Sequence, residues 1–317
     1  MRVLLASPID PGTTTSLRAR HDVLEAGPGD LRESVADAEV IILRSGPVLS
    51  GDVLAAAPGL RAVVRAGSGL DNIDLEYARQ RRIRVVRIAG MSGPPVAELT
   101  FALLLALARN VTLADRLIRE GDWPKARLGG PLLQGKTLGV VGAGNIGSLV
   151  GQMGAAWGMR VLGCVGHPSR AEAERLAGHG VTLADFDEVI ERAHFVTLHV
   201  PLDPSTRHLV DRGVLERMRP GSLLVNMARG GVVDEVALYD ALTQGDRLAG
   251  AALDVHETEG QGTVSPLAAL ANVVLTPHIG AMAVDTQRQI GTRVLELVEA
   301  CDAGRLEEEA AHGELVV

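Results

Sequence analysis

The chain has 317 residues, of which 46% are hydrophobic and only 2% aromatic, so aliphatic side chains must fill its cores. Its 31 basic and 39 acidic residues give a net charge of -8, which makes nucleic acid and anionic membranes unfavourable partners. Two cysteines are too few for a disulfide framework. The longest apolar stretch, residues 101–108, is too short to span a bilayer. We therefore expect a cytoplasmic protein.

Short apolar runs alternate with helical patterns along the chain, an order that predicts parallel sheets. We expect a first set of strands at residues 3–6, 40–43, 62–64 and 85–88, followed by a helix at 96–110. A second set is expected at 138–141, 161–165, 195–198, 223–226, 250–253 and 273–275, followed by a helix at 284–302. The acidic, Ala-rich tail at 307–314 is expected to be disordered.

This order predicts an α/β protein with two doubly wound parallel-sheet domains. Residues 98–285 would form a Rossmann dinucleotide-binding domain, and residues 1–97 with 286–317 a flavodoxin-like, substrate-binding domain.

A glycine-rich turn, residues 142–147, lies between an apolar strand and an amphipathic helix. Gly142 would allow the tight turn, Gly144 the close approach of a pyrophosphate, and Gly147 close packing of the helix on the strand. The phosphates of a dinucleotide would then lie at the helix N-terminus, formed by Asn145 and Ile146. The alternative is an Ala/Gly-rich turn that binds nothing.

Val165 stands where a unit of this kind usually carries the acid that accepts hydrogen bonds from the ribose of NAD. No carboxylate follows before Glu172, whereas His167, Ser169 and Arg170 could donate to a 2′-phosphate. We therefore favour NADP(H) over NAD(H), while an ordinary solvated loop is the alternative for these three residues.

Three strands of the first domain lead into arginines: Arg44, Arg65 and Arg87. Because the carboxyl ends of parallel strands meet at one edge of a sheet, these cations would lie together, close to a turn at 67–69 whose N–H groups suit a carboxylate. This arrangement indicates a multiply charged anionic substrate, such as a phosphorylated acid or a dicarboxylate. Solvent-facing arginines are the alternative.

In the second domain a cation, an acidic segment and an imidazole each follow a strand, namely Arg229, residues 254–259 and His278. Oxidation of a 2-hydroxy acid needs such a set. Arg229 would hold the substrate carboxylate and polarise the C2 oxygen, and His278 would move the proton as the hydride passes to or from the cofactor. Taken singly, these residues favour structural roles: a buried salt bridge for Arg229 and Glu259, and a loop histidine with its hydrogen bonds satisfied for His278.

A series of motifs resembles the D-isomer-specific 2-hydroxyacid dehydrogenases, and within them the D-3-phosphoglycerate dehydrogenase branch. The resemblance runs from about residue 40 to residue 305 and is carried, in this order, by 65–74 (RAGSGLDNID), 96–100 (VAELT), the glycine-rich turn, 201–206 (PLDPST), 228–231 (ARGG), 252–255 (ALDV) and 276–280 (TPHIG).

By position, the resemblance implies that Arg229, Glu259 and His278 are catalytic and that Asp254 contacts the nicotinamide amide. Further cofactor contacts would come from Pro201, Thr206, Met227, Ala228 and Gly280, and further substrate contacts from Ser68, Gly69 and Ser92. The resemblance also implies a homodimer joined by an arm at 110–133, on which Trp123 is exposed.

Some positions depart from the family pattern. Arg87 and Ser92 replace two asparagines, and Gly260 replaces the proline after the catalytic glutamate, so a different substrate and a mobile connection at 260–262 are expected. The turn at Val165 is more similar to that of NADP-using glyoxylate and hydroxypyruvate reductases. We predict an NAD(P)-dependent, metal-free D-2-hydroxyacid dehydrogenase for a small anionic acid. The alternative is a dinucleotide-sensing regulatory protein on the same scaffold.

Overall fold

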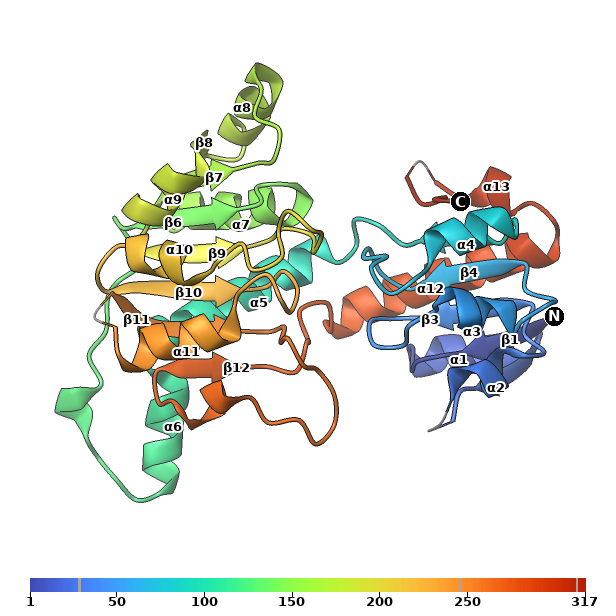
Figure 1. The fold of residues 1–317 in the computed structure, drawn as a ribbon, viewed down its shortest axis with the longest axis horizontal. Coiled ribbons are helices and arrows are strands. Elements are labelled where there is room, and N and C mark those ends of the chain that lie inside the picture. The colour runs from blue at the N-terminus through green and yellow to red at the C-terminus, as the bar shows by residue number, and fades with distance from the viewer. Residues whose placement is uncertain (28–29, 246, 312) are drawn as a thin grey trace. The chain divides into compact units, whose positions relative to one another are not determined.

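The computed structural model describes residues 1–27, 30–245, 247–311 and 313–317, which divide into two compact units (Figure 1). Unit 1 comprises residues 1–92 and 281–317, and unit 2 comprises residues 93–280. The boundaries predicted from the sequence fall five residues later at both places. Which ligand each unit binds stays a prediction.

Unit 1 is built on a five-stranded parallel sheet with the order β2-β1-β3-β4-β5. This is the strand order of flavodoxin-like doubly wound folds, as predicted. Its elements are β1 (Arg2–Leu5), α1 (Pro11–Arg18), β2 (Asp22–Glu25), α2 (Leu31–Val35), β3 (Val40–Leu43), α3 (Gly51–Ala55), β4 (Ala62–Arg65), α4 (Leu75–Gln80), β5 (Arg84–Arg87), α12 (Val284–Asp302) and α13 (Leu306–Glu309).

Alternation along the strands of unit 1 supplies two apolar layers. In β3, Val40 and Ile42 pack with residues of α1 and α12, whereas Ile41 and Leu43 pack with residues of α2, α3 and α4. All four β3 side chains are fully buried. The short helices are fixed locally by capping: Asp10, which precedes Pro11, accepts a hydrogen bond from the Thr13 N–H at the start of α1.

Unit 2 is built on a seven-stranded parallel sheet with the order β12-β11-β10-β9-β6-β7-β8. Its central portion has the Rossmann order, in which the fourth strand crosses back beside the first. Its elements are α5 (Gly93–Ala108), α6 (Val111–Arg119), η1 (Lys125–Arg127), β6 (Thr137–Val141), α7 (Asn145–Ala156), β7 (Arg160–Cys164), α8 (Arg170–Ala177), β8 (Val181–Leu183), α9 (Phe186–Arg192), β9 (Phe195–Leu198), α10 (Arg212–Arg217), β10 (Ser222–Asn226), α11 (Glu235–Thr243), β11 (Leu248–Leu253), η2 (Pro266–Ala269) and β12 (Val273–Leu275).

Helices cover both faces of this sheet. One apolar layer contains Leu104 of α5 and Val150 of α7, and the other contains Val189 of α9, Leu215 of α10 and Leu238 of α11. The two-domain α/β prediction is therefore confirmed, and the carboxyl ends of β6, β9, β10, β11 and β12 lie at one edge of the sheet.

Two edge strands, β2 and β8, are absent from the sequence-based prediction. β2 buries none of its residues fully and β8 has three residues, so neither gives a clear apolar run.

The acidic tail is ordered where the structure describes it, contrary to the expectation of disorder. Residues 306–309 form α13, and Leu315 forms an antiparallel bridge with Val86 of β5. Arg293 of α12 binds Glu314 at 2.8 Å, with only 12% and 9% of the two side chains exposed. Position 312 of this tail lies outside the described residues.

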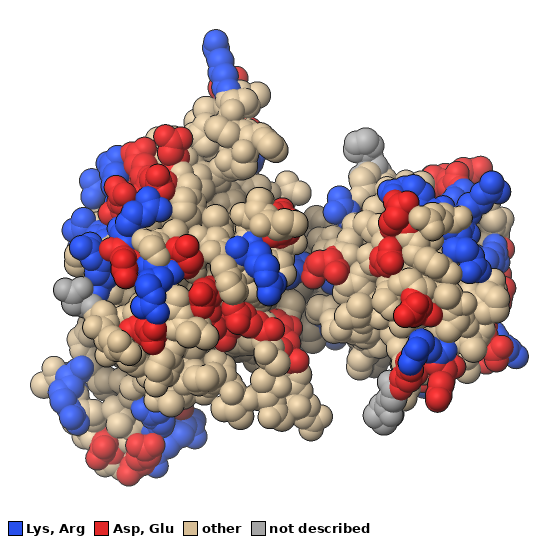
Figure 2. All heavy atoms as spheres, in the orientation of Figure 1, with Lys and Arg blue, Asp and Glu red and all other residues tan. Residues whose placement is uncertain are grey.

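Several general features bear on function. Basic and acidic side chains are interspersed over the face of each unit shown in Figure 2.

Within the described ranges, no single helix is long and apolar enough to cross a membrane. Helices α5 and α6 have the length and apolar composition only when they are taken together, and they are bent by 61°. The described part of the chain contains no group of three His, Cys, Asp or Glu side chains placed to hold a metal ion.

Candidate active site

The glycine-rich turn follows β6 and fits a dinucleotide. Gly142 has a φ of 88°, and a Cβ there would lie 2.7 Å from the His199 carbonyl oxygen. A Cβ on Gly147 would lie 2.3 Å from the Gly142 carbonyl oxygen, so the helix packs closely on the turn. A Cβ on Gly144 would meet nothing within 4 Å, which leaves the space that a pyrophosphate needs.

Helix α7 begins at Asn145, and its N-cap, Gly144, contributes no capping side chain. Its first N–H groups are thus suited to phosphate oxygens. Asn145 and Ile146 lie in this first turn, as the sequence predicted, and their contact with a cofactor stays a prediction.

Beyond β7, the three predicted phosphate donors lie on the surface. His167 is exposed; Ser169 caps α8 by accepting a hydrogen bond from the Glu172 N–H; Arg170 pairs with Glu174 at 2.8 Å, and 93% of its side chain is exposed. Sequence reasoning missed Arg175, which donates to the Ala143 carbonyl at 2.6 Å and pairs with Glu172 at 2.7 Å. Arg175 therefore fastens α8 to the glycine-rich turn.

Arg229 lies on a tight turn at the carboxyl end of β10. Asn226, buried at the end of the strand, accepts from the Ala228 N–H and donates to the Arg229 carbonyl. The Arg229 side chain, which is half-buried, donates to the Ala228 carbonyl at 2.7 Å. Asn226 is a positioning contact that sequence reasoning missed.

The turn of Arg229 packs directly on the segment that follows β11. A Cβ on Gly230 would lie 1.8 Å from the His256 carbonyl oxygen, so only glycine allows this approach. The backbone next to Arg229 is thus in contact with the backbone three residues before Glu259.

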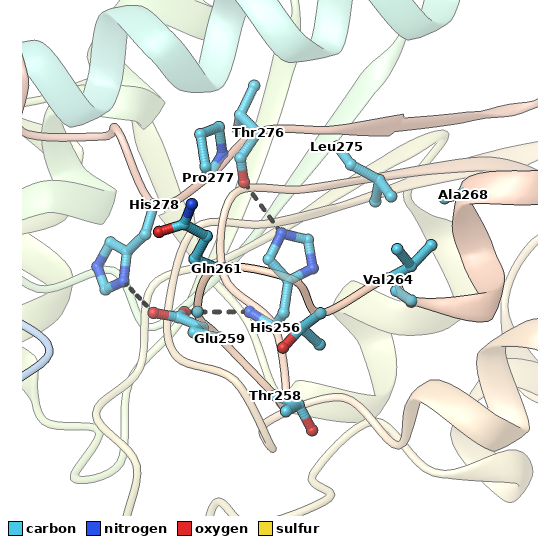
Figure 3. A pocket seen from close by; sticks show the side chains of 13 residues that line it. His256, Thr258, Glu259, Gln261, Val264, Ala268, Leu275, Thr276, Pro277 and His278 are labelled. Atoms are coloured by element: carbon cyan, nitrogen blue, oxygen red, sulfur yellow. Dashed lines mark hydrogen bonds and ion pairs between the residues drawn. The ribbon is translucent and has the colours of Figure 1, made fainter.

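Glu259 and His278 form a pair at the ends of the neighbouring strands β11 and β12. The Nδ1 atom of His278 lies 2.9 Å from Oε2 of Glu259, and the His256 N–H donates to the other oxygen at 3.2 Å (Figure 3). Burial works against ionisation of Glu259, but the hydrogen bond and charge of His278 outweigh it and lower the pKa of this carboxyl. Glu259 therefore stays ionised and orients the imidazole.

His278 has an unusual backbone conformation, with a φ of 55°. Asp254 holds it there: the Asp254 carbonyl accepts from the His278 N–H, and its carboxylate accepts from the N–H groups of Ile279 and Gly280 and from the Thr276 hydroxyl. Asp254 is only 2% exposed. The structure thus gives Asp254 a positioning role in addition to the predicted contact with nicotinamide, which stays a prediction.

The remaining predicted cofactor residues lie at the same edge of the sheet. The Thr206 hydroxyl donates to the Pro201 carbonyl at 2.7 Å and so shapes the turn after β9. Met227 and Ala228 are buried at the end of β10, and a Cβ on Gly280 would meet the Met227 methyl group at 3.3 Å.

His199, which sequence reasoning missed, follows β9 beside Gly142. Its Nε2 lies 2.9 Å from the Thr197 hydroxyl, and burial lowers the pKa of the imidazole to about 3. A histidine that stays neutral at this place cannot add a positive charge to the cofactor side of the turn.

A cavity of about 580 Å³ adjoins the Glu259–His278 pair. It is lined by one continuous region of the chain, which runs from His256 to His278 and contains β12; the lining includes His256, Val264 and Leu275 (Figure 3). The Nε2 of His256 donates to the Thr276 carbonyl at 3.0 Å, which braces the backbone just before His278.

The predicted substrate residues other than Arg229 and His278 belong to unit 1. Arg65 and Arg87 are direct partners in the register of β4 and β5, and Arg44 follows β3, so all three lie at one sheet edge. The Arg44 guanidinium meets the sulfur of Met282, and Arg87 donates to the Gly313 carbonyl. The Ser68 and Ser92 hydroxyls are 3.1 Å apart, which brings the turn containing Gly69 close to the end of the first segment of unit 1.

Comparison with known proteins agrees with this architecture. Residues 101–280 match the family model of the D-isomer specific 2-hydroxyacid dehydrogenase, NAD binding domain. The D-3-phosphoglycerate dehydrogenase of Methanocaldococcus jannaschii is 42% identical over 280 residues, covering 88% of this chain and 52% of that protein. The hydroxypyruvate reductase of Thermotoga maritima is 37% identical over 305 residues, covering 94% of this chain and 97% of that protein.

Among solved structures, the D-lactate dehydrogenase of Aquifex aeolicus, complexed with NAD and lactic acid, has a TM-score of 0.87 at 28% identity and covers 100% of this chain and 99% of that one. The chain spans about half the length of the D-3-phosphoglycerate dehydrogenases that it matches. With the matched domain and these relatives, the chain belongs to the D-isomer specific 2-hydroxyacid dehydrogenase family.

Proposed function

We propose that this protein is an NAD(P)-dependent oxidoreductase that transfers a hydride between a nicotinamide cofactor and a D-2-hydroxy acid or its 2-oxo acid. The observation that carries the proposal is the Glu259–His278 pair, 2.9 Å apart, at the same sheet edge as the glycine-rich turn. Such a carboxylate–imidazole pair is suited to proton transfer.

His278 would act as the acid in reduction and as the base in oxidation. Glu259 accepts a hydrogen bond from the Nδ1–H of His278, so Nε2 is left for the C2 oxygen of the substrate. In reduction Nε2 donates a proton to that oxygen, and in oxidation it accepts the hydroxyl proton. When bound, the nicotinamide supplies or accepts the hydride.

Arg229 would bind the substrate carboxylate and polarise the C2 oxygen. A guanidinium is suited to this because it presents several N–H donors in one plane. Asn226 and the close approach of Gly230 to the His256 carbonyl hold the turn that carries Arg229. The structure at the end of β10 thus positions the guanidinium.

The substrate we favour is an anionic acid, phosphorylated, phosphonylated or dicarboxylic. Its support is the placement of Arg44, Arg65 and Arg87 at the carboxyl ends of neighbouring strands of unit 1, with Ser68, Gly69 and Ser92 as polar contacts. The relative named for phosphoglycerate agrees with an acid of this kind, whereas hydroxypyruvate, which names the other relative, is a three-carbon acid with a single carboxylate.

The cofactor we favour is NADP(H). The end of β7 offers His167, Ser169 and Arg170 and carries no carboxylate at Val165. Arg170 could leave the exposed Glu174 for a 2′-phosphate at small cost, since surface ion pairs contribute little.

We further propose a cytoplasmic homodimer joined by residues 110–133. Helix α6 buries none of its own residues, and 50% of Ile118 and 81% of Trp123 are exposed. Exposed apolar residues grouped on one segment favour an interface. Both cysteines are free, in keeping with a reducing compartment.

The test is oxidation of NADPH and, separately, of NADH, each varied up to saturation, with glyoxylate, hydroxypyruvate, 3-phosphohydroxypyruvate, 2-oxoglutarate and phosphonopyruvate. We expect turnover with at least one of the last three acids, which are phosphorylated, dicarboxylic or phosphonylated, and a lower KM for NADPH. Turnover confined to glyoxylate and hydroxypyruvate would contradict this substrate class, and a lower KM for NADH would contradict the cofactor preference. Tight dinucleotide binding without any turnover would favour a regulatory protein instead.

A further inference from the structure

Glu235, the first residue of α11, joins the two ends of the loop that carries Glu259. One carboxylate oxygen accepts from the Glu257 N–H at 2.7 Å, and the other accepts from the Ser265 hydroxyl at 3.3 Å. We propose that Glu235 is a positioning residue, which holds residues 257–265, here called the Glu259 loop, in the conformation where Glu259 meets His278. This inference rests on the proposed catalytic pair.

The Glu259 loop has little packing of its own. Residues 258–264 are all exposed, and Gly260 and Gly262 have φ values of 136° and 85°. The backbone hydrogen bond that the structure describes within it runs from the Thr263 N–H to the Gly260 carbonyl, at 3.3 Å. A loop of this kind, whose ends are close together, takes its conformation from the contacts at those ends.

Each end of the loop is tied to a second group besides Glu235. At the first end, Glu257 accepts from Nε2 of His208 at 2.8 Å. At the other end, the Ser265 hydroxyl also accepts from the Leu267 N–H, at 3.3 Å, and so begins η2. Among the hydrogen bonds described, those of the Glu235 carboxylate join both ends of the loop, and its backbone belongs to α11.

Loss of this contact would act on Glu259 from a distance. Glu259 reaches His278 through one hydrogen bond, so a shift of about 1 Å in the loop is enough to break it, and misplacement on this scale can cost about a hundredfold in rate. The cofactor contacts would be spared, because the glycine-rich turn lies on β6 and α7.

The test compares Glu235→Ala, Glu235→Gln and Ser265→Ala with Asp240→Ala as the matched control. Asp240 is another acid of α11, and it pairs with Arg212 rather than with the loop. For each we would measure kcat and KM with the best 2-oxo acid of the panel, the Kd for NADPH, and amide hydrogen exchange of residues 257–265.

For Glu235→Ala we expect kcat to fall by about tenfold or more, with Kd for NADPH unchanged and exchange faster in the loop. Glu235→Gln should recover most of kcat, because the amide oxygen still accepts from the Glu257 N–H and the amide NH2 can donate to Ser265. The kcat of Ser265→Ala should lie between those of the two Glu235 variants, and the kcat of Asp240→Ala should equal that of the parent protein.

A Glu235→Ala protein with unchanged kcat would overturn the proposal, as would a loss of kcat without faster loop exchange. Should the parent protein turn over none of the acids, the proposed function fails by itself. Hydrogen exchange then decides on Glu235 separately: faster exchange of 257–265 supports its role in holding the loop, and unchanged exchange refutes it.

Discussion

His278 is held in position by contacts with a residue that is remote in sequence. Its left-handed backbone is stabilised by Asp254, which is buried at the end of β11 and accepts three hydrogen bonds through its carboxylate. Strained backbone at a candidate proton donor is consistent with preorganisation for catalysis, because the surrounding structure must supply the energy that holds it.

Replacement of His278 by alanine tests this residue alone. We expect kcat/KM for the 2-oxo acid to fall by about two to four orders of magnitude, which is the usual contribution of a general acid. The Kd for NADPH, measured by fluorescence titration, should change little. The matched control is His179→Ala, which replaces a histidine that precedes β8. This variant should retain full activity. Loss of NADPH binding in His278→Ala would mean that His278 is structural.

At the scale of elements, the site depends on how closely the turn after β10 approaches the segment after β11. Gly230→Ala would place a Cβ 1.8 Å from the His256 carbonyl oxygen, so one of the two backbones must move. We expect kcat to fall by about tenfold or more while the fold is retained. In Gly213→Ala of α10, the new Cβ would lie 3.5 Å from its nearest neighbour, and this control should keep the parent rate.

The C-terminal segment depends on a nearly buried charge cluster. Burial opposes ionisation of Glu314, but the hydrogen bond from Arg293 outweighs it and lowers the pKa of this carboxyl. Arg293→Ala should therefore reduce the free energy of unfolding by about 1–3 kcal/mol, because it leaves a buried acid without its main donor. Arg79→Ala, which removes an exposed pair with Glu76, should cost about 0.5 kcal/mol or less.

This cluster also makes the free energy of unfolding depend on pH. The pKa of Glu314 is lowered in the folded state, so ionised Glu314 stabilises the fold fully above the ordinary glutamate pKa of about 4.3. This stabilisation is lost as the pH falls through the lower pKa of the folded state. The Tm of Glu314→Gln should hence differ from that of the parent protein at pH 7, and the two Tm values should become equal in acid. An equal difference at both pH values would show that Glu314 is not ionised in the folded protein.

For the whole molecule, the sequence was sufficient to predict two parallel α/β units, since buried strands such as residues 40–43 are continuous apolar runs. The glycine-rich turn and the residues at the strand ends were also predictable, because parallel topology assigns them to one edge. The roles of Asn226, Asp254 and Glu235 were not, because each depends on which distant backbone group it meets. The ordered tail depends in the same way on Arg293.

The proposed homodimer is a property of the whole molecule and has its own test. Ile118→Asp with Trp123→Ser would place polar groups on the exposed segment and should shift the sedimentation coefficient from dimer to monomer without changing the circular dichroism spectrum. A parent protein that sediments as a monomer would contradict the proposed interface directly.

The central claim is that Glu259 and His278 act together as the proton donor, and reductase kcat in Glu259→Gln tests it most directly. Glu259 is ionised in the parent protein and accepts the hydrogen bond that orients the His278 imidazole. Without that carboxylate, kcat should fall by about tenfold or more, while the Kd for NADPH stays constant. An unchanged kcat would show that the pair does not supply the proton.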